Sequence, residues 1–346
     1  MRLHYFSFLF FYLLVMEPFF SVLMVNFNGL EHLPACLESL ERQSFQAFEV
    51  ILVDNASSDA SVLWVQEHFP RVRVVESEKN LGFAGGNNLG LSFCKAPYVF
   101  LLNNDTVLFE DCLEKLKEAV DEVPQVSVLQ ALMLDFNDSA KVDSWGDALY
   151  WWGTSYNGRG EAVRDLEVMP AVIPIASACG GASVWPVDLL VSLGAFDESY
   201  FLLFEDVDLS MRARHQGASI FLVKEAKLLH KGSASIGKHS SLNVFYSARN
   251  LIWTRFKNFP ALTLLKSLPF LCLYQTMMFF RAIYKGRFWV WLKAQFAALW
   301  GLNTIWKKRK EILSASKISR LEFESWLRKG AIQEKWMAYK KSKLKV

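Results

Sequence analysis

The sequence predicts an α/β fold organised around a mostly parallel sheet, and three observations support this prediction. Short apolar segments of strand length alternate with segments that are apolar at helical spacing. That alternation implies parallel strands joined by right-handed crossovers. Several expected strands also end in polar residues, which would gather at one edge of such a sheet. The length of 346 residues suits one sizeable domain with an appendage, or two small domains.

The segment before the first expected strand is almost wholly apolar from Tyr5 to Met16. It is too short to span a bilayer as a helix, and it lacks the small-residue cleavage site of a signal peptide. Met16 stands where a domain would naturally begin, directly before the first strand. We therefore expect residues 1–16 to be an apolar arm whose residues before Met16 are dispensable, either because they come from an upstream start site or because the arm is loosely held.

Strands and helices are expected to alternate from residue 21 to residue 103. The expected strands cover residues 21–25, 48–53, 72–75 and 99–102. The expected helices cover residues 33–43 and 58–68, and a glycine-rich loop at 80–88 opens a third. This βαβαβαβ order is typical of a sheet covered by helices on its faces.

Polar side chains follow three of these strands, at Asn26 and Asn28, at Asp54 and Asn55, and from Asn103 to Asp105. Ligands gather at the carboxyl ends of strands in open α/β sheets, so we expect a nucleotide-binding edge here. Asp105 is placed to hold a hard cation against a phosphate. The alternative is that the segment forms only a turn followed by a helix cap.

The glycine-rich segment from Asn80 to Asn88 is the next candidate for ligand contact. Glycine lets the backbone approach a ligand closely, and the amide groups at a helix start can be free for anionic oxygens. The glycine spacing matches neither a dinucleotide-binding fingerprint nor a P-loop. An ordinary flexible turn remains the alternative.

Composition indicates a chain that contacts more than water. Hydrophobic residues make up 52% of the sequence and mean hydropathy is +0.16, so part of the apolar surface is expected to meet a membrane or a partner. Net charge is only +3, but after residue 306 basic residues outnumber acidic ones about threefold, which suits an anionic surface. We expect no nucleic-acid partner. The five scattered cysteines contain no CxxC pair, which disfavours a disulfide framework or zinc site and fits a reducing cytoplasm.

Residues 135–169 are irregular and rich in aromatic side chains: Trp145, Trp151, Trp152 and Tyr156 stand among Gly, Asp and Asn. Aromatic faces beside polar groups suit sugar stacking or an interfacial acceptor. The alternative, which we favour slightly, is a small hairpin packed on the sheet. The following Gly180-Gly181 pair predicts a close approach of backbone as the chain enters a strand.

A second acidic segment runs from Phe204 to Arg212 and follows the sequence Gly194-Ala195-Phe196-Asp197-Glu198. We expect a helix to begin near Asp206, because acidic residues are favoured at a helix start. Helix capping alone is the simpler explanation of this pattern. His230 follows an expected strand at 219–223, and an isolated histidine is more often structural than a ligand.

The character of the chain changes after Phe259. Residues 260–280 are strongly apolar but contain Lys266 and Pro269, and residues 288–302 are rich in tryptophan. Both segments could be buried helices. Their cationic flanks and tryptophans favour helices lying in a membrane interface, and a single span by residues 262–280 is less favoured.

Four segments occur in a characteristic order: Val25-Asn26-Phe27-Asn28, Val53 to Asp59, Asn80 to Asn87, and Leu102 to Thr106. This ordered set resembles family 2 glycosyltransferases with the GT-A fold, particularly the bacterial rhamnosyltransferase-like members. The resemblance covers about residues 20–258. It implies a GT-A glycosyltransferase domain at 17–258, to which residues 259–346 add amphipathic, basic, membrane-associating helices.

The resemblance also implies roles for individual residues. Asp206 would be the catalytic base, with Glu205 as an alternate or acceptor contact. Asn103 and Asp105 occupy the two ends of the family's DxD element; the first acid is Asn here, which leaves Asp105 with His230 to bind Mg²⁺ or Mn²⁺. The expected nucleotide-sugar contacts are Asn26, Asp54, Asn55, Ser57, Asp59, Gly82, Gly85, Gly86, Asn87, Asn103, Asn104 and Arg249.

The expected function is an inverting transfer of a sugar, L-rhamnose or another hexose, in cell-wall polysaccharide biosynthesis. The donor would be dTDP-rhamnose or a UDP-sugar, and the acceptor a hydroxyl of a cell-surface glycan or lipid-linked intermediate. The expected location is the cytoplasmic face of the inner or plasma membrane, peripheral or monotopic. Two alternatives are a sugar-nucleotide pyrophosphorylase, disfavoured because Asn26-Phe27-Asn28-Gly29 replaces its glycine- and arginine-rich loop, and a non-catalytic membrane-associated nucleotide-sugar binder.

Overall fold

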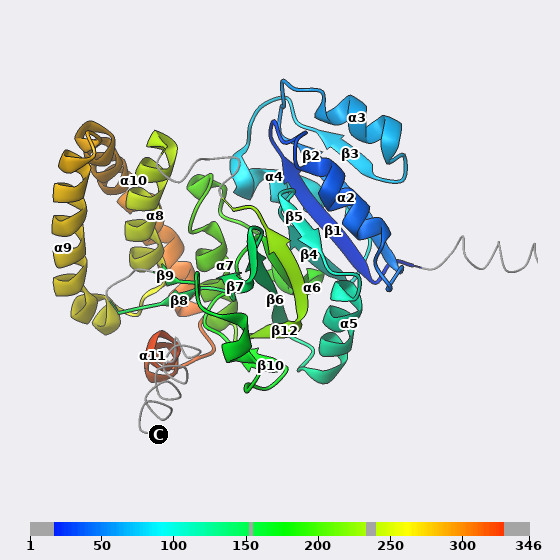
Figure 1. Cartoon of the computed structure of the whole chain (residues 1–346). Coiled ribbons are helices and arrows are strands. Elements are labelled where there is room, and N and C mark those ends of the chain that lie inside the picture. Colours follow the sequence, from blue (N-terminus) through cyan, green and yellow to red (C-terminus); the bar gives the residue numbers. More distant parts are fainter. Residues whose placement is uncertain (1–16, 152–154, 233–239, 329–346) are drawn as a thin grey trace, which may run out of the picture.

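The computed structural model describes residues 17–151, 155–232 and 240–328. A ten-stranded sheet forms the centre of these residues, in the order β10-β12-β6-β11-β4-β1-β2-β3, with β5 beside β12 and β7 beside β6 (Figure 1). Its strands are β1 (Phe20–Asn26), β2 (Phe48–Asp54), β3 (Arg73–Glu76), β4 (Tyr98–Leu102), β5 (Thr106–Leu108), β6 (Ser127–Asp135), β7 (Asp138–Ser144), β10 (Val172–Pro174), β11 (Ala182–Pro186) and β12 (Ser219–His230). A separate pair joins β8 (Ala148–Leu149) to β9 (Ser155–Tyr156).

The sheet is mostly parallel, as the alternating pattern predicts. Strands β4, β1, β2 and β3 are neighbours that run parallel, and β12 runs parallel to β6. Strand β11 lies antiparallel between β4 and β6, so these two groups point the same way. Register aligns Asn26 with Asp54 at the carboxyl ends of β1 and β2, which brings two predicted site residues together.

Helices cover both faces of the sheet. They are α2 (Leu33–Glu41), α3 (Ser61–His68), α4 (Gly82–Leu91), α5 (Cys112–Glu122), α6 (Val187–Ser192), α7 (Glu205–His215), α8 (Ser241–Asn258), α9 (Ala261–Tyr284), α10 (Phe288–Ser314) and α11 (Arg320–Arg328). Two single turns of 3₁₀ helix, η1 (Val163–Leu166) and η2 (Glu198–Tyr200), lie in the connections.

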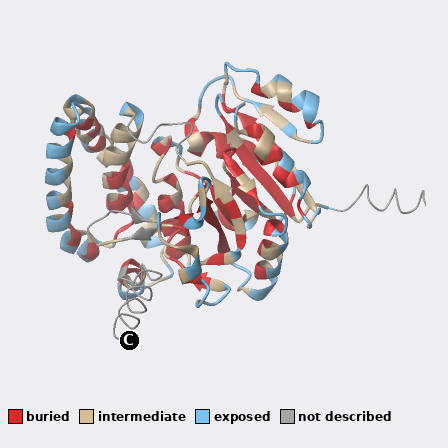
Figure 2. Ribbon diagram, viewed as in Figure 1, coloured by how far each residue is buried: buried red, intermediate tan, exposed pale blue. Residues whose placement is uncertain are grey.

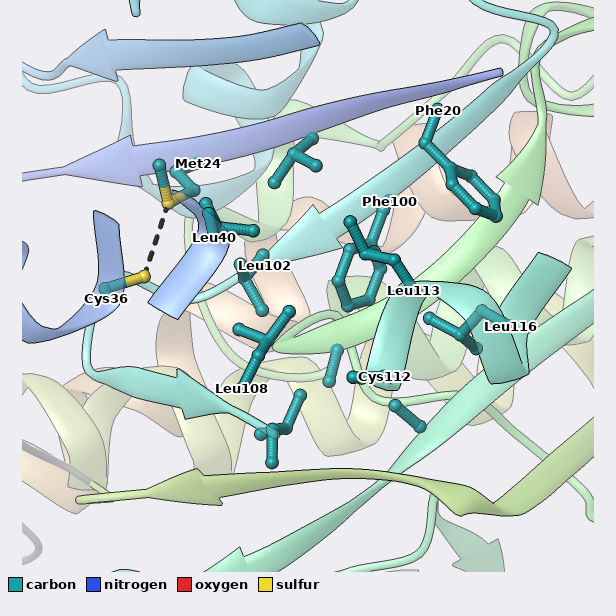
Figure 3. Packing of buried hydrophobic residues seen from close by; sticks show 14 of the residues in the cluster. Phe20, Met24, Cys36, Leu40, Phe100, Leu102, Leu108, Cys112, Leu113 and Leu116 are labelled. Carbon is teal, nitrogen blue, oxygen red and sulfur yellow. Dashed lines mark hydrogen bonds between the residues drawn. The ribbon is translucent and has the colours of Figure 1, made fainter. Parts of the chain in front are cut away.

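Alternate residues of each strand build two separate cores. Phe20, Val22 and Met24 of β1 pack with α2 and α5, while Leu23 packs on the opposite face with α4, α6 and α7. The buried residues concentrate in the sheet, and the helices expose their outer faces (Figure 2). Figure 3 shows the first core, where Phe100 and Leu102 of β4 meet Leu113 and Leu116 of α5. Burial on both faces fixes the register, and with it the position of the strand ends.

The glycine-rich segment is a correction to the prediction, because most of it is helix rather than loop. Residues Gly82–Leu91 form α4, and its glycines allow close packing on β1 and β2. A Cβ atom on Gly90 would lie 2.2 Å from Leu23 Cδ1, and one on Gly86 would lie 2.8 Å from Val25 Cγ1. The low helix propensity of glycine is therefore offset by an approach that no larger residue allows.

The aromatic segment supports the hairpin interpretation where it is described. Trp145 is 3% exposed, belongs to the core with Leu166 and Ile175, and lies against Gly158. It is thus not available for sugar stacking. Trp151 is half-buried, and its carbonyl oxygen accepts a hydrogen bond from Arg255 Nη2 at 2.9 Å. Trp152 lies outside the described residues.

The helices after residue 240 pack against the sheet domain through α7 and α8. Trp253 of α8 donates a hydrogen bond to the carbonyl oxygen of Ala298 on α10 at 3.0 Å, and Gly301 leaves room for its ring. Within the described part of the chain, α9 is long and apolar enough to cross a membrane by length and composition, although other kinds of helix pass the same test. Residues 1–16 and 329–346, which include the predicted N-terminal arm, lie outside the described residues.

Candidate active site

Three predicted residues meet at the carboxyl ends of β1, β2 and β4. Asn26 Nδ2 donates to Asp54 Oδ1 at 3.1 Å, and Asn104 Nδ2 donates to Asn26 Oδ1 at 2.7 Å. All three side chains are at least nine-tenths buried, so their orientation is fixed by the sheet and by one another. The carboxylate and amides form one hydrogen-bonded row across three strands.

The loop after β2 wraps over this row. The backbone amide of Ser57 donates to Asp54 Oδ2 at 2.9 Å, and Asn28 donates its own amide to Ser57 Oγ at 2.9 Å. Asp59 is exposed and accepts hydrogen bonds from the amides of Leu30 and Ser61, each at 3.1 Å. Asp59 therefore ties the loop after β1 to the start of α3, which shapes the edge beside Asp54.

The start of α4 corrects one expectation. Its amides were expected to be free for anionic oxygens, but Gly82 N donates to Asn80 Oδ1 at 2.8 Å and Leu81 N donates to Asn55 Oδ1 at 2.9 Å. Ala84 N donates to the carbonyl oxygen of Phe201 at 3.2 Å. These groups hold α4 in place, because an occupied donor cannot also bind a phosphate oxygen.

The other predicted residues of this region also have internal partners. Asn55 Nδ2 donates to the carbonyl oxygen of Gly82 at 2.9 Å, and Asn87 Nδ2 donates to that of Phe83 at 2.8 Å. Gly82 has φ +72°, and its backbone lies against the carbonyl oxygen of Phe201. Gly85 packs against Leu81. The structure thus places these residues in the framework behind the site, and their contact with a ligand stays a prediction.

Asp105 and His230 come together from segments that are far apart in the sequence. Strand β5 pairs with the end of β12, and the register aligns Thr106 with His230. His230 Nε2 lies 3.2 Å from Asp105 Oδ1, and Asn103 Nδ2 lies 3.5 Å from the same ring nitrogen. Both Asp105 and His230 are largely buried, at 6% and 12% side-chain exposure.

Asp143 on β7 completes this group, and sequence reasoning missed it. His230 Nδ1 lies 2.6 Å from Asp143 Oδ2, and the other carboxylate oxygen of Asp143 pairs with Arg159 at 2.7 Å. Burial alone would favour the neutral imidazole, but the hydrogen bonds to Asp105 and Asp143 raise the pKa of His230 to about 9. Burial also opposes ionisation of Asp105, yet His230 lowers the pKa of that carboxyl below its usual value.

The atoms of this group fit a divalent cation. Adjacent ligands of an octahedral Mg²⁺ or Mn²⁺ lie about 3 Å apart when each metal–ligand distance is about 2.1 Å. The separation of 3.2 Å between Asp105 Oδ1 and His230 Nε2 matches this for an ion that displaces the Nε2 proton, and Asp143 supplies the carboxylate that commonly orients a metal-binding histidine. In the part of the chain that the structure describes, no cluster of three His, Cys, Asp or Glu side chains is placed to hold a metal alone. Two protein ligands suit an ion that also binds substrate phosphates.

Two further groups beside Asp105 were not among the predicted site residues. Lys231 N donates to the carbonyl oxygen of Asp105 at 3.0 Å, and Lys231 Nζ lies 3.2 Å from His32 Nδ1. His32 is also among the groups whose charge lowers the pKa of Asp105. The Lys231 ammonium adds positive charge beside Asp105. Lys231 directly follows His230, so its position in the sequence was a usable signal.

Asp206 lies at the start of α7, as the acidic pattern predicts. Gly180 N donates to Asp206 Oδ2 at 2.9 Å, and Val207 N donates to Asp206 Oδ1 at 2.8 Å. Burial raises the pKa of Asp206 above its usual value, although these two amides act against it. Glu205 is 5% exposed, and burial together with the neighbouring Asp206 raises its pKa well above the usual range.

The Gly180-Gly181 pair connects the two halves of the site. The amide of Gly180 donates a hydrogen bond to Asp206. The carbonyl oxygen of the following residue, Gly181, accepts a hydrogen bond from Asn103 N at 3.0 Å. A Cβ atom on Gly181 would lie 2.9 Å from Asn103 Nδ2, and one on Gly180 would lie 3.5 Å from Asp206 Cβ. Asp206 and the Asn103–Asp105 segment therefore lie on the same edge of the sheet.

A strained turn presents Asp206 to this edge. Phe201, Leu203 and Phe204 have φ between 65° and 71°, which non-glycine residues rarely adopt. Asn250 Nδ2 on α8 lies within 3.0 Å of the carbonyl oxygens of Tyr200, Leu202 and Leu203, and so holds the turn. Arg249 was predicted at the leaving group; the structure instead places its Nη2 on the carbonyl oxygens of Ser199 and Tyr200, at 2.8 and 2.9 Å.

Comparisons with known proteins agree with this architecture. The model of the glycosyl transferase family 2 matches residues 21–172. The glycosyltransferase GlyG of Streptococcus pneumoniae is 32% identical over 112 residues, which cover 31% of this chain and 36% of that protein. The aligned part thus spans just over a third of the length of the first curated relatives.

Longer matches cover more than two thirds of this chain. An N-acetylglucosaminyl-diphospho-decaprenol L-rhamnosyltransferase of Mycobacterium tuberculosis is 25% identical over 276 residues, covering 69% of this chain and 88% of that protein. The mannosyltransferase PcManGT of Pyrobaculum calidifontis, solved in complex with GDP-Man and Mn²⁺, shares the fold with a TM-score of 0.52, 15% identity and 86% coverage of each chain. Residues 21–172 thus match glycosyl transferase family 2, the longer match is to a rhamnosyltransferase, and the fold is of the GT-A type.

Proposed function

We propose that this protein transfers a hexose from a nucleoside diphosphate sugar to an acceptor hydroxyl, with inversion at the anomeric carbon. The observation that carries the proposal is the shared edge of Asp206 with Asn103 and Asp105, joined through Gly180 and Gly181. The Asn103–Asp105 segment, beside the diphosphate, and the Asp206 carboxylate, which would act as the base for the acceptor, would then flank one sugar. The match of residues 21–172 to glycosyl transferase family 2 supports the same reaction class.

The row of Asn26, Asp54 and Asn104 is the proposed place of the nucleoside. Asp54 would accept hydrogen bonds from the base, and the exposed loop with Ser57 and Asp59 would frame it. Related proteins are a rhamnosyltransferase and a mannosyltransferase complexed with GDP-Man. L-rhamnose from dTDP-rhamnose is the favoured donor sugar, with another hexose from a UDP-sugar as the alternative.

The proposed acceptor is a glycan or lipid-linked intermediate in cell-wall polysaccharide biosynthesis. The related rhamnosyltransferase is named for a diphospho-decaprenol substrate, and the exposed apolar residues of α9 and α10 would bring this chain to a membrane surface. We place the protein on the cytoplasmic face of the inner or plasma membrane, attached peripherally or monotopically.

The diphosphate would lie against Asp105, His230 and Lys231. Asp105 and His230 would hold a Mg²⁺ or Mn²⁺ ion, which when bound neutralises charge on the departing nucleoside diphosphate. Asp143 forms a hydrogen bond with His230 Nδ1, and this bond keeps the Nε2 atom of the ring facing Asp105. Lys231 adds positive charge on the same side, and its ammonium lies 3.2 Å from His32 Nδ1.

Asp206 would remove the proton from the acceptor hydroxyl as the hydroxyl oxygen attacks the anomeric carbon. The bond from that carbon to the diphosphate oxygen breaks, and its electron pair leaves with the diphosphate. Two backbone amides fix the Asp206 carboxylate, and burial raises its pKa, which improves its affinity for the incoming proton. The raised pKa of Glu205 favours its neutral form, so Asp206 carries the charge of this adjacent pair.

Replacing Asp206 with Asn tests this proposal. The change keeps the shape but removes the base, so transfer should fall by about 10²- to 10⁴-fold, the range typical of a general base. Binding of the nucleoside diphosphate, measured by calorimetry, should stay within about twofold. Asp188→Asn, an exposed acid on α6, is the matched control and should transfer normally. Near-normal turnover by Asp206→Asn would refute the assignment of the base.

A further inference from the structure

A cavity of about 370 Å³ lies among the three helices α8, α9 and α10, away from the proposed transfer site. Val244, Ser247 and Ala248 line it from α8, whereas Tyr246, Arg249 and Asn250 contact the turn before Asp206. At 3.6 residues per turn these two sets occupy different faces of α8. Helix α8 thus separates the cavity from the transfer site, and the mechanism leaves the cavity without a role.

The cavity wall contains polar groups without partners. Both amide atoms of Gln275 and the Nε1 atom of Trp291 are buried and lack a hydrogen-bond partner among the described residues. Trp291 is only 9% exposed. Buried polar atoms are nearly always paired, so these three atoms indicate a ligand that offers both acceptors and a donor.

The charge around the cavity is wholly positive. Arg281, Lys285 and Arg287 line it, and the sequence contains no Asp or Glu from residue 226 to residue 310. Arg287 Nη1 donates to Ser241 Oγ at 2.9 Å, which fixes that cation at the start of α8. Among the described residues that line the cavity none is a carboxylate, so three cations there favour an anionic ligand.

The surface beside the cavity is apolar. Leu273, Met277, Phe280 and Tyr284 recur every three or four residues along α9, and each is at least 62% exposed. Trp289, at the start of α10, is 71% exposed. Figure 2 shows this exposed side along α9. An apolar helix face with a tryptophan and cations at its end is typical of a protein surface that lies in a membrane interface.

We propose that this cavity binds the head group of an anionic membrane lipid that carries a phosphate and a hydroxyl. The phosphate oxygens would accept hydrogen bonds from Trp291 Nε1, Gln275 Nε2 and the cations, and a head-group hydroxyl would donate to Gln275 Oε1. The acyl chains would lie along the exposed face of α9. This inference concerns attachment to the membrane and holds whether or not the proposed transfer reaction is correct.

The first test compares two triple variants of the full chain that remove equal charge. Arg281→Gln with Lys285→Gln and Arg287→Gln empties the cavity wall of cations, whereas Lys293→Gln with Lys307→Gln and Lys310→Gln removes exposed cations elsewhere on α10. Binding is measured by sedimentation with vesicles of phosphatidylcholine alone or mixed equally with phosphatidylglycerol. The cavity triple should bind the mixed vesicles about 100-fold more weakly, and the control triple clearly better than the cavity triple. Equal loss in both would overturn the cavity as the site.

The second test keeps the charge and changes only the cavity. Gln275→Leu removes two unpartnered polar atoms, so the variant should fold at least as well as the parent, as checked by thermal unfolding. The parent should prefer phosphatidylglycerol over phosphatidic acid, which has no free head-group hydroxyl, and Gln275→Leu should lose about three- to tenfold of this preference. Soluble glycerol 3-phosphate should compete with the vesicles. An unchanged lipid preference in Gln275→Leu would contradict a head group in this cavity.

Discussion

At the scale of single residues, the hydrogen bond between His230 and Asp143 determines which ring nitrogen of His230 faces Asp105. With Nδ1 taken by Asp143 at 2.6 Å, only Nε2 faces Asp105, at 3.2 Å. The motifs predicted Asp105 and His230, which the structure brings together. They could not predict Asp143, because it stands 87 residues before His230 in an irregular segment, and only the pairing of β7 with β6 places it there.

Replacing Asp143 with Asn should lower the pKa of His230 from its value of about 9. Asn still accepts a hydrogen bond from Nδ1, but it lacks the negative charge that favours the imidazolium. Because the folded-state pKa lies above the unfolded value of about 6.5, the stability from this charge is present below pH of about 6.5 and is lost as pH rises toward 9. The variant should lose part of that stability at pH 6 and little above pH 9.

A titration of His230 by nuclear magnetic resonance, together with unfolding curves at both pH values, checks this prediction. Asp138→Asn, a half-buried acid at the start of the same strand that pairs with Lys141, serves as the control and should leave His230 unchanged. An unaltered His230 titration in Asp143→Asn would show that the carboxylate does not govern the ring.

At the scale of elements, the local sequence predicted where strands and helices lie, but it did not predict the contacts that form between distant segments. Strand positions followed from short apolar segments, because both faces of β1 and β4 are buried, and the start of α7 followed from its acidic residues. Most of helix α4 was expected to be a loop, because a glycine-rich segment suggests a flexible backbone. The structure shows that its glycines are needed for packing, since Leu23 and Val25 fill the space that larger side chains would occupy. Arg249 and Asn250 bind backbone carbonyls of the turn before α7, and such contacts leave no signal in side-chain spacing.

Lys257 joins the same turn to α7 and α8 through buried charges. Its Nζ lies 2.6 Å from Asp197 and 2.8 Å from Asp208, and the three side chains are almost fully buried. Although burial opposes ionisation, Lys257 lowers the pKa of both carboxyls. Because those folded-state values lie below the unfolded ones, this stabilisation exists above pH of about 4 and is lost as pH falls below it.

Lys257→Met should reduce the free energy of unfolding by about 3–5 kcal/mol at pH 7, since two carboxylates lose their buried partner. Lys310→Met, an exposed lysine on α10, should change it by less than about 0.5 kcal/mol. Urea denaturation followed by circular dichroism gives both values. Equal stability of the two variants at pH 7 would mean that the buried charges do not hold the turn.

At the scale of the whole molecule, the order of the motifs was sufficient to predict the parallel half of the sheet and the match to glycosyl transferase family 2. It was not sufficient for the packing of the C-terminal helices, which depends on contacts between segments far apart in the chain. Trp253 meets α10 at Ala298, and Lys308 of α10 pairs with Asp197 at 2.6 Å. The proposed membrane-facing helices are therefore tied to the turn that presents Asp206.

The N-terminal arm offers a prediction on the same scale. Deleting residues 1–15, so that Met16 comes first, should leave the midpoint of thermal unfolding and the rate of transfer unchanged, because the sheet begins at Phe20 with its own core partners. Differential scanning calorimetry and a transfer assay measure the two quantities. If the shortened chain fails to fold or to transfer, the arm is part of the working protein.

The proposed meeting of Asp105, His230 and Asp206 at one donor site is tested most directly by calorimetric titration of a nucleoside diphosphate with and without Mn²⁺. The parent chain and Asp206→Asn should bind more tightly with the ion, whereas Asp105→Ala should lose this dependence because one of the two ligands is missing. Asp111→Ala, an exposed acid before α5, should behave as the parent. Ion-dependent binding that persists in Asp105→Ala would contradict the site.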